Sequence, residues 1–329
     1  MPTVETVTGP IDAEELGTTL VHEHLIFRDD AVAVEWPHIA PTAPNPDDPE
    51  PDDFLRPALE SARAVLERGV KTICDPTCMF GGRDVAFMRR VAEQTGLQVV
   101  PCTGIYTYDY LPTFFVSRDA DFMADVFVHD IERGIQGTEV KAGFIKCAAD
   151  EPGVTENVEK VHRAAARASV RTGTPIMAHS RPASETGPRQ IEIFEEEGVD
   201  LSRVQIAHTG DTDDLDYIER LLEKGVTIGM DRYGLELFLP RERRDATVLA
   251  LLERGHADRM FLSQDYCATL DWYPREVEEQ LLASGAAKDW SMTLVFDQVI
   301  PALREAGATD DQIETMLVAN PRRWLTGEG

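Results

Sequence analysis

Six residues whose side chains can bind metal ions or carry protons stand at or near the ends of short apolar segments. They are His22, His24, Lys146, His179, His208 and Asp265. Imidazole and carboxylate groups are suitable ligands for zinc, iron, cobalt or manganese. A lone histidine in such a place is more often a hydrogen-bonded core residue, and the His22-Glu23-His24 triplet alone is weak support for a metal site. The recurrence of these residue types at successive segment ends favours a metal site.

Lys146 is the unusual member of this set. It follows the apolar run 142–145 in a chain that has 6 lysines and 26 arginines, so its use here indicates a property that arginine lacks. A buried ammonium group beside two metal cations is unfavourable, because burial and like charge both favour the neutral amine. A neutral amine can add CO2 to form an anionic carbamate, whereas a guanidinium group stays protonated. We therefore predict N6-carboxylysine at Lys146, bridging two divalent ions; the alternative is a lysine that reaches water from the strand end.

The elements that must position these residues form a repeating pattern. Eight short apolar runs occur at 18–24, 71–76, 98–104, 142–147, 175–180, 204–210, 226–231 and 260–265. Near-continuous apolar runs are typical of parallel strands covered on both faces. Helical patterns occur at 57–69, 83–95, 119–135, 156–173, 188–197, 213–224, 242–255 and 290–306. Eight such units predict an α/β fold, a single (β/α)8 TIM barrel domain over residues 1–329, with a doubly wound open sheet as the alternative.

A barrel would bring the six residues together. Side chains alternate along a strand, so His22 and His24 point the same way. Inward-facing residues at the carboxyl ends of the strands converge on one mouth of the barrel. We therefore expect a binuclear metal centre at the C-terminal mouth of the strands.

The composition disfavours several classes of partner. A net charge of -27 argues against nucleic acid and anionic membrane surfaces, which attract basic patches. The chain has no apolar run long enough to span a membrane, and segment 1–17 has no signal-peptide pattern. Five irregularly spaced cysteines are typical of free thiols in a cytoplasmic protein. We expect a cytoplasmic protein that acts on a small molecule.

The sequences around the six residues resemble a known family. The segments "HEH", "GFIKCAADEPG", "HTGDTDD", "IGMDRYGLELFLP" and "QDYCATLDW" are similar to those of phosphotriesterase-like lactonases, in the phosphotriesterase family of the amidohydrolase superfamily. The likeness runs from "TLVHEH" to "ANPRRWL" and is most specific over 204–272. It implies that His22, His24 and Asp265 hold one metal ion. It also implies that His179 and His208 hold a second ion, with carboxylated Lys146 bridging the two.

The resemblance further implies the reaction and the residues around the substrate. Members of this branch hydrolyse lactones, commonly N-acyl homoserine lactones, and hydrolyse organophosphate triesters as a side activity. Tyr106 of "TGIYTY" matches a residue near the reacting water, Arg232 of "DRYG" one above the metals, and Trp272 of "CATLDW" one that lines the acyl channel. We expect two zinc ions, with iron, cobalt or manganese as alternatives, and a homodimer.

The expected reaction is attack of hydroxide, which divalent metals make available at neutral pH, on the lactone carbonyl. Tyr106 would help to polarise the carbonyl, and Asp265 would take the proton and pass it to the departing alkoxide. The alternatives are an organophosphate triesterase or another carboxylic-ester hydrolase, and a non-catalytic metal-binding sensor. A substrate panel separates the hydrolases, and the presence of every ligand position argues against the sensor.

Two features depart from the family pattern. Gln264 stands before Asp265 where the family often has histidine, which could change the hydrogen bonding of the aspartate. The segment 41–53, rich in proline and aspartate, is longer and more acidic than usual. It could shape substrate access or the dimer surface.

Overall fold

The computed structural model describes residues 2–36 and 54–328, and within them eight parallel strands form one sheet. The strands are β3 (Thr18–Leu20), β6 (Val70–Asp75), β7 (Gln98–Gly104), β8 (Phe144–Ala148), β9 (Ile176–His179), β10 (Val204–Ala207), β11 (Thr227–Met230) and β12 (Met260–Leu262). Each pairs with its neighbours in chain order, so the predicted TIM barrel is confirmed and the doubly wound sheet is wrong. The 41–53 segment lies outside the described residues.

The seam between the first and last strands is closed by short pairs beyond their ends. In chain order these are β4 (Glu23–His24), β5 (Phe27–Arg28), β13 (Tyr266–Cys267) and β14 (Leu270–Asp271). β13 runs parallel to β4, and β14 runs parallel to β5. In addition, the Asp265 N–H donates to His22 O at 3.0 Å. These pairs make the barrel nearly continuous at the edge where the first predicted ligands lie.

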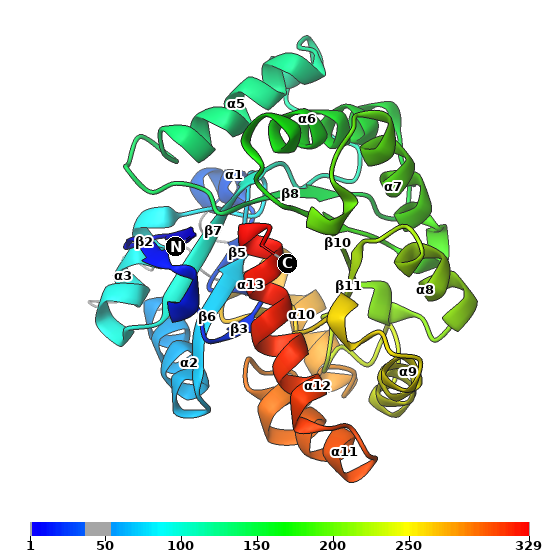
Figure 1. Ribbon diagram of the computed structural model, residues 1–329. Helices are drawn as coiled ribbons and strands as arrows, with labels where there is room; N and C mark the ends of the chain where they lie inside the picture. Colours follow the sequence, from blue (N-terminus) through cyan, green and yellow to red (C-terminus); the bar gives the residue numbers. More distant parts are fainter. Residues whose placement is uncertain (1, 37–53, 329) are drawn as a thin grey trace.

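Helices surround the barrel (Figure 1). They are α2 (Leu55–Glu67), α3 (Val85–Thr95), α5 (Ala120–Glu132), α6 (Glu156–Thr172), α7 (Thr186–Glu196), α8 (Leu215–Leu222), α9 (Arg241–Glu253) and α11 (Ile300–Glu305). The helix α3 shows why these segments stop and start where they do. The Asp84 carboxylate accepts from the Phe87 N–H at its first turn, and Gly96 ends it with a φ of 83°. The segment expected as helix from residue 290 begins later, with a π-helical turn Val295–Val299 before α11.

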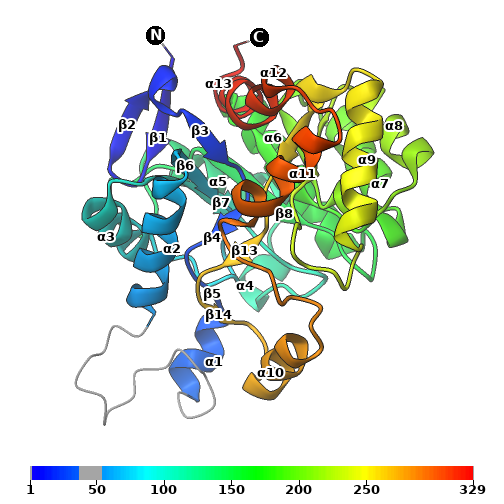
Figure 2. The same ribbon diagram turned by 90° about the horizontal axis from the view of Figure 1, so that it is seen from below.

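The two ends of the barrel carry different elements (Figure 2). Both termini lie at one end, with β1 (Thr3–Thr6), β2 (Gly9–Asp12), α12 (Asp310–Glu314) and α13 (Asn320–Thr326). The opposite end carries α1 (Asp30–Glu35), α4 (Thr113–Val116) and α10 (Arg275–Ala283). The elements at both ends lie outside the eight expected βα units.

Apolar side chains fill the barrel and close its base. Phe144 and Phe261 pack against the buried ring of Trp324 on α13, with ring centroids 5.5 and 5.8 Å away. The indole N–H of Trp324 donates to Arg203 O at 3.1 Å, which pairs its polar atom. All five cysteines are free thiols. No helix in the described part of the chain is both long and apolar enough to cross a membrane.

Candidate active site

The structure brings all six predicted ligands to the carboxyl end of the barrel, where they line one cavity. His24 lies in β4, Lys146 in β8, and His179 is the last residue of β9. His208 and Asp265 were expected as strand residues, but they follow β10 and β12 with positive φ values of 63° and 51°. A left-handed conformation is uncommon for residues other than glycine. At these two positions the chain turns away from the sheet as it enters the mouth.

Three of the predicted ligands form one tight group. His22 Nε2 lies 3.3 Å from Asp265 Oδ1, and His24 Nε2 lies 3.2 Å from the same oxygen. These ligand atoms lie close enough together to hold one metal ion. The other ring nitrogen of His24 lies 2.6 Å from the Thr77 hydroxyl, which itself donates to Ile26 O. His24 therefore donates from Nδ1 and presents Nε2 to the group.

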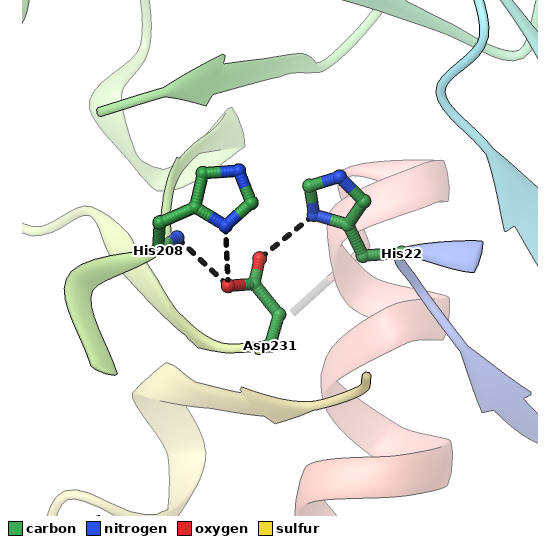
Figure 3. Close-up of side chains that lie close together, drawn as sticks. All are labelled: His22, His208 and Asp231. Carbon is green, nitrogen blue, oxygen red and sulfur yellow. Dashed lines mark hydrogen bonds and ion pairs between the residues drawn. The ribbon is translucent and has the colours of Figure 1, made fainter. Parts of the chain in front are cut away.

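Asp231 holds one histidine from each part of the site (Figure 3). Its Oδ2 lies 2.9 Å from His22 Nδ1, and its Oδ1 lies 3.1 Å from His208 Nδ1. The His208 backbone N–H and the Gln205 amide also donate to it, at 2.7 and 3.1 Å. With both oxygens occupied by protein donors, Asp231 orients the imidazoles rather than binding a metal itself, although it lies close enough to His22 and His208 to be one of three ligands. Both histidines thus present Nε2 to the centre.

His179 is oriented in the opposite sense. Its Nε2 lies 2.6 Å from Asp150 Oδ2, and Arg181 donates to the other oxygen of Asp150 at 3.0 Å. The nitrogen left for a metal is therefore Nδ1. The rings of His179 and His208 are adjacent, with centroids 4.4 Å apart. These two histidines form the second cluster of predicted ligands.

Lys146 contacts the first cluster through His22, and its charge acts on both His22 and His179. Its side chain is 1% exposed, so it does not reach water. Its Nζ lies 3.2 Å from His22 Nε2 and 3.4 Å from Met177 Sδ. Within the described residues it forms no salt bridge with a carboxylate. A buried ammonium group without an anionic partner is costly, which fits an amine that gains a negative group.

Burial sets the protonation state of these residues. It lowers the pKa of His179 to about 4, and it lowers the pKa values of His22 and His208 as well. It also lowers the pKa of Lys146, against the opposing charges of Asp265 and Asp231. The three histidines are therefore neutral at pH 7, which is the form that binds metal ions. The donor set and its hydrogen bonds fit a pair of divalent ions.

Arg232 connects Asp265 to a second buried carboxylate. Its Nε donates to Asp265 Oδ2 at 2.9 Å, and its Nη1 donates to Asp211 Oδ2 at 3.0 Å. Burial alone would raise the pKa of Asp265, but interactions with the histidines and Arg232 hold it well below its usual range. The guanidinium group also lies 4.4 Å above the Phe238 ring.

The other two predicted substrate residues lie on one wall of the cavity. The Tyr106 hydroxyl lies 2.8 Å from the Tyr108 hydroxyl, and the Tyr106 ring packs edge-on against His179 and Trp272. The Trp272 ring also packs against Phe27, with centroids 4.8 Å apart. Burial raises the pKa of Tyr106 well above its usual value, so its hydroxyl is neutral.

The cavity that contains the site has a volume of about 450 Å3. It is lined by the six predicted ligands and by apolar side chains, most of them more exposed, that form its outer wall; Glu151 and Arg181 also line it. That outer wall consists of Leu235, Leu237, Phe238, Leu270, Trp272, Val277 and Leu281. A second cavity, of about 640 Å3, shares Tyr106, Tyr108 and Trp272 with it but is lined by none of the predicted ligands. The chemistry therefore belongs to the smaller cavity.

The hydrogen bond of the Gln264 side chain does not involve the Asp265 carboxylate. The buried side-chain amide donates to Met292 O, and the backbone carbonyl of Gln264 accepts from the Trp290 indole at 2.9 Å. Gln264 therefore links the site to the segment before α11.

Several residues that orient the site were not identified from the sequence. Asp231 ends the apolar run 226–231 in the same way as the ligands end theirs, and that position was the available signal. Asp150 and Thr77 lie in loops after strands, and Asp211 ends a short 3-10 helix after β10, where no spacing distinguishes them from surface residues. Glu23 stands between two ligands and was noted only as part of their motif.

Comparisons with known proteins identify the family. The sequence model of the phosphotriesterase family matches residues 2–325. The aryldialkylphosphatase of Saccharolobus solfataricus is 44% identical over 316 residues, which cover 96% of this chain and 97% of that protein. The structure of the phosphotriesterase from Mycobacterium tuberculosis has a TM-score of 0.90 at 41% identity, and the match covers 98% of both chains. A structure from the molecular engineering of organophosphate hydrolysis activity from a weak promiscuous lactonase template has a TM-score of 0.89 at 35% identity, covering 98% of this chain and 99% of that one. The chain belongs to the phosphotriesterase family and is a metal-dependent hydrolase.

Proposed function

We propose that the protein hydrolyses lactones that carry an apolar tail, such as N-acyl homoserine lactones, with organophosphate triesters as side substrates. The observation that carries this proposal is the apolar outer wall of the cavity beside the predicted ligands. Each buried CH2 group contributes about 0.8 kcal/mol. A wall of this kind favours a tailed substrate over a compact triester.

In this proposal the six ligands hold two divalent ions. His22, His24 and Asp265 hold one, His179 and His208 hold the other, and Lys146 bridges them as N6-carboxylysine. Zinc is the first candidate, with iron, cobalt or manganese as alternatives. Bound ions would lower the pKa of water and polarise a carbonyl or phosphoryl oxygen. The buried amine of Lys146, which forms no salt bridge to a carboxylate within the described residues, and the neutral imidazoles support this assignment.

The chain's own residues have separate roles in the reaction. Asp265 takes the proton of the attacking water and returns it to the alkoxide released when the lactone C–O bond breaks. Arg232 holds Oδ2 of this carboxylate, while Oδ1 faces His22 and His24. The neutral hydroxyl of Tyr106 donates a hydrogen bond to the substrate oxygen, and Trp272 packs against the tail.

A main activity on organophosphate triesters is the second candidate. The aryldialkylphosphatase relative, at 44% identity, favours it. Hydrolysis of another carboxylic ester would use the same groups. A non-catalytic sensor is not retained, because the chain is a member of a hydrolase family.

Metal analysis combined with a substrate panel tests the proposal. We expect kcat/KM for tailed lactones to exceed that for a dialkyl aryl phosphate by at least about 10²-fold, or roughly 2.7 kcal/mol of transition-state preference. Unsubstituted lactones of the same ring size serve as the control for the tail. Equal or faster hydrolysis of the triester would reject the lactonase assignment and leave the metal centre unaffected.

We also propose that the chain is one domain, forms a homodimer and acts in the cytoplasm. Exposed apolar side chains at the mouth of the barrel, Leu237, Phe238, Tyr273 and Val277, support an interface there. The free thiols of all five cysteines support a reducing compartment. Calorimetric unfolding, light scattering and cell fractionation test these three statements in turn.

A further inference from the structure

The carboxyl group of Glu23 is fully buried and contacts the chain on both sides of Asp265. Its Oε1 accepts the Gln264 N–H at 2.9 Å, and its Oε2 accepts the Tyr266 N–H at 3.0 Å. Glu23 itself stands between His22 and His24. One buried carboxyl group thus connects the strand that carries two predicted ligands to the turn that carries the third.

The turn at Asp265 explains why such a contact is needed. Asp265 has a φ of 51°, a conformation that costs a residue other than glycine about 1–2 kcal/mol. The left-handed residue falls between the end of β12 and the start of β13, and the regular pairing of β13 with β4 begins only after it, at Tyr266. A buried N–H left without an acceptor costs about 1–3 kcal/mol. Glu23 supplies the acceptors for the backbone N–H groups of the residues immediately before and after Asp265.

We propose that Glu23 is a positioning residue that determines where the Asp265 carboxylate meets His22 and His24. The proposal rests on the assignment of Asp265 as a metal ligand made above. Arg232 holds Asp265 from the cavity side through Oδ2, and the Asp265 N–H donates to His22 O at 3.0 Å. Glu23 holds the backbone from the opposite side, so the aspartate keeps one orientation.

Glu23 does not act as a ligand or an acid–base group. Side chains alternate along a strand, so Glu23 points to the face opposite His22 and His24, and both of its oxygens are occupied by peptide donors. Burial raises the pKa of its carboxyl group, and the two donors oppose that shift. The contact requires only that both oxygens accept hydrogen bonds.

Glu23→Gln tests the proposal, because a glutamine NH2 group cannot accept from a peptide N–H. Protein loaded with two Co2+ ions is titrated with a chelator, and the loss of each ion is followed by visible absorption. His24→Ala and His179→Ala identify which signal belongs to which ion. We expect the ion held by His22, His24 and Asp265 to bind about 10–100-fold more weakly, while the affinity of the other ion changes less than about threefold.

Asp130→Asn is the matched control. Asp130 is also a buried carboxylate with two donors, Arg83 and Thr103, each at 2.8 Å, but it lies on α5 away from the site. It should lower thermal stability without selective loss of one ion. The proposal would be overturned if Glu23→Gln lowered the affinity for both ions equally. It would also be overturned if the variant released both ions as the unaltered protein does.

A double-mutant cycle separates positioning from a general structural effect. If Glu23 acts through Asp265, adding Glu23→Gln to an Asp265→Asn protein should lower the affinity for this ion by less than about a further threefold. Additive losses would contradict the proposal. If Glu23→Gln does not fold, Glu23→Asp keeps the carboxyl group on a shorter stem and is judged by the same readout. Metal release requires no substrate, so failure of the lactonase assignment is a distinguishable result.

Discussion

At the scale of single residues, the hydrogen bonds of the four histidines decide which nitrogen each presents. His22 and His208 are both held through Nδ1 by Asp231, whereas Asp150 holds His179 through Nε2. Asp231→Ala removes both acceptor oxygens, so all four of their hydrogen bonds, including those to both histidines, are lost. We expect it to lower the affinity for both metal ions by about 10–100-fold, as measured by chelator titration.

Asp150→Ala is the comparison for this prediction. It should lower the affinity only for the ion that His179 holds, because Asp150 contacts no other predicted ligand. An Asp231→Ala protein that loses only one ion would show that the carboxylate does not link the two clusters.

Lys146 carries a second prediction at this scale. Lys146→Ala should lose metal and activity together, with partial rescue by a short-chain carboxylate such as acetate that can occupy the vacated space. Lys146→Arg should not be rescued, because it places a cation where an anion is required. Metal content and kcat with and without the carboxylate are the measurements. Full metallation of Lys146→Ala without added carboxylate would argue against a bridging role.

At the scale of elements, the segment from Trp272 into α10 supplies much of the apolar wall. Trp272→Ala should lower kcat/KM for long-tailed lactones about tenfold or more, while unsubstituted lactones change much less, because only the tail reaches this wall. Steady-state kinetics on a series of tail lengths measure the difference. Trp36→Ala, which removes an exposed tryptophan outside the cavity, is the control. An equal loss for all lactones would place Trp272 in the fold or an interface instead.

The contact between α6 and α7 gives a pH prediction. His162 on α6 lies 2.7 Å from Val158 O and 2.8 Å from the Gln190 amide on α7, which also donates to His179 O. Burial lowers the pKa of His162 from 6.5 to about 4. The unfolded chain therefore takes up this proton first, and the free energy of unfolding falls as the pH falls from about 6.5 to 4.

His162→Gln measures this contribution. Between pH 7 and pH 4, the free energy of unfolding should fall by about 3 kcal/mol more in the unaltered protein than in the variant. Urea unfolding at each pH measures it. Subtracting the two proteins removes the contribution of the other histidines. Parallel losses in both would show that His162 is not kept neutral by the fold.

At the scale of the whole molecule, the net charge of -27 is the dominant property. Self-repulsion of this size destabilises a compact chain. Raising the salt concentration from about 0.1 M to 1 M shortens the Debye length from about 10 Å to about 3 Å. We expect the Tm to rise by at least about 3 °C, which corresponds to about 2 kcal/mol for a chain of this length. Calorimetry in NaCl measures the Tm, with sucrose as an uncharged control. An unchanged Tm in salt would contradict the prediction.

Much of the fold was predictable because its information is local. Eight apolar runs, each separated from the next by a helical pattern, predict parallel strands covered on both faces, and eight such units favour a barrel over a doubly wound sheet. The predicted helices agree closely with the structure at α3 and α6, where a capping residue and a glycine mark the ends. The elements that close the base, including Trp324, were not predicted because their burial depends on the assembled barrel.

The sequence by itself determined the residue types of the site and their positions near strand ends, which chain order alone brings to one mouth. Only the tertiary structure decided how they are oriented. Glu23 meets Gln264 and Asp231 meets His22 across separations of 241 and 209 residues. These contacts depend on the register of the closing seam and on the left-handed turns at His208 and Asp265. No local pattern encodes that register, because it is set by the packing of the complete barrel.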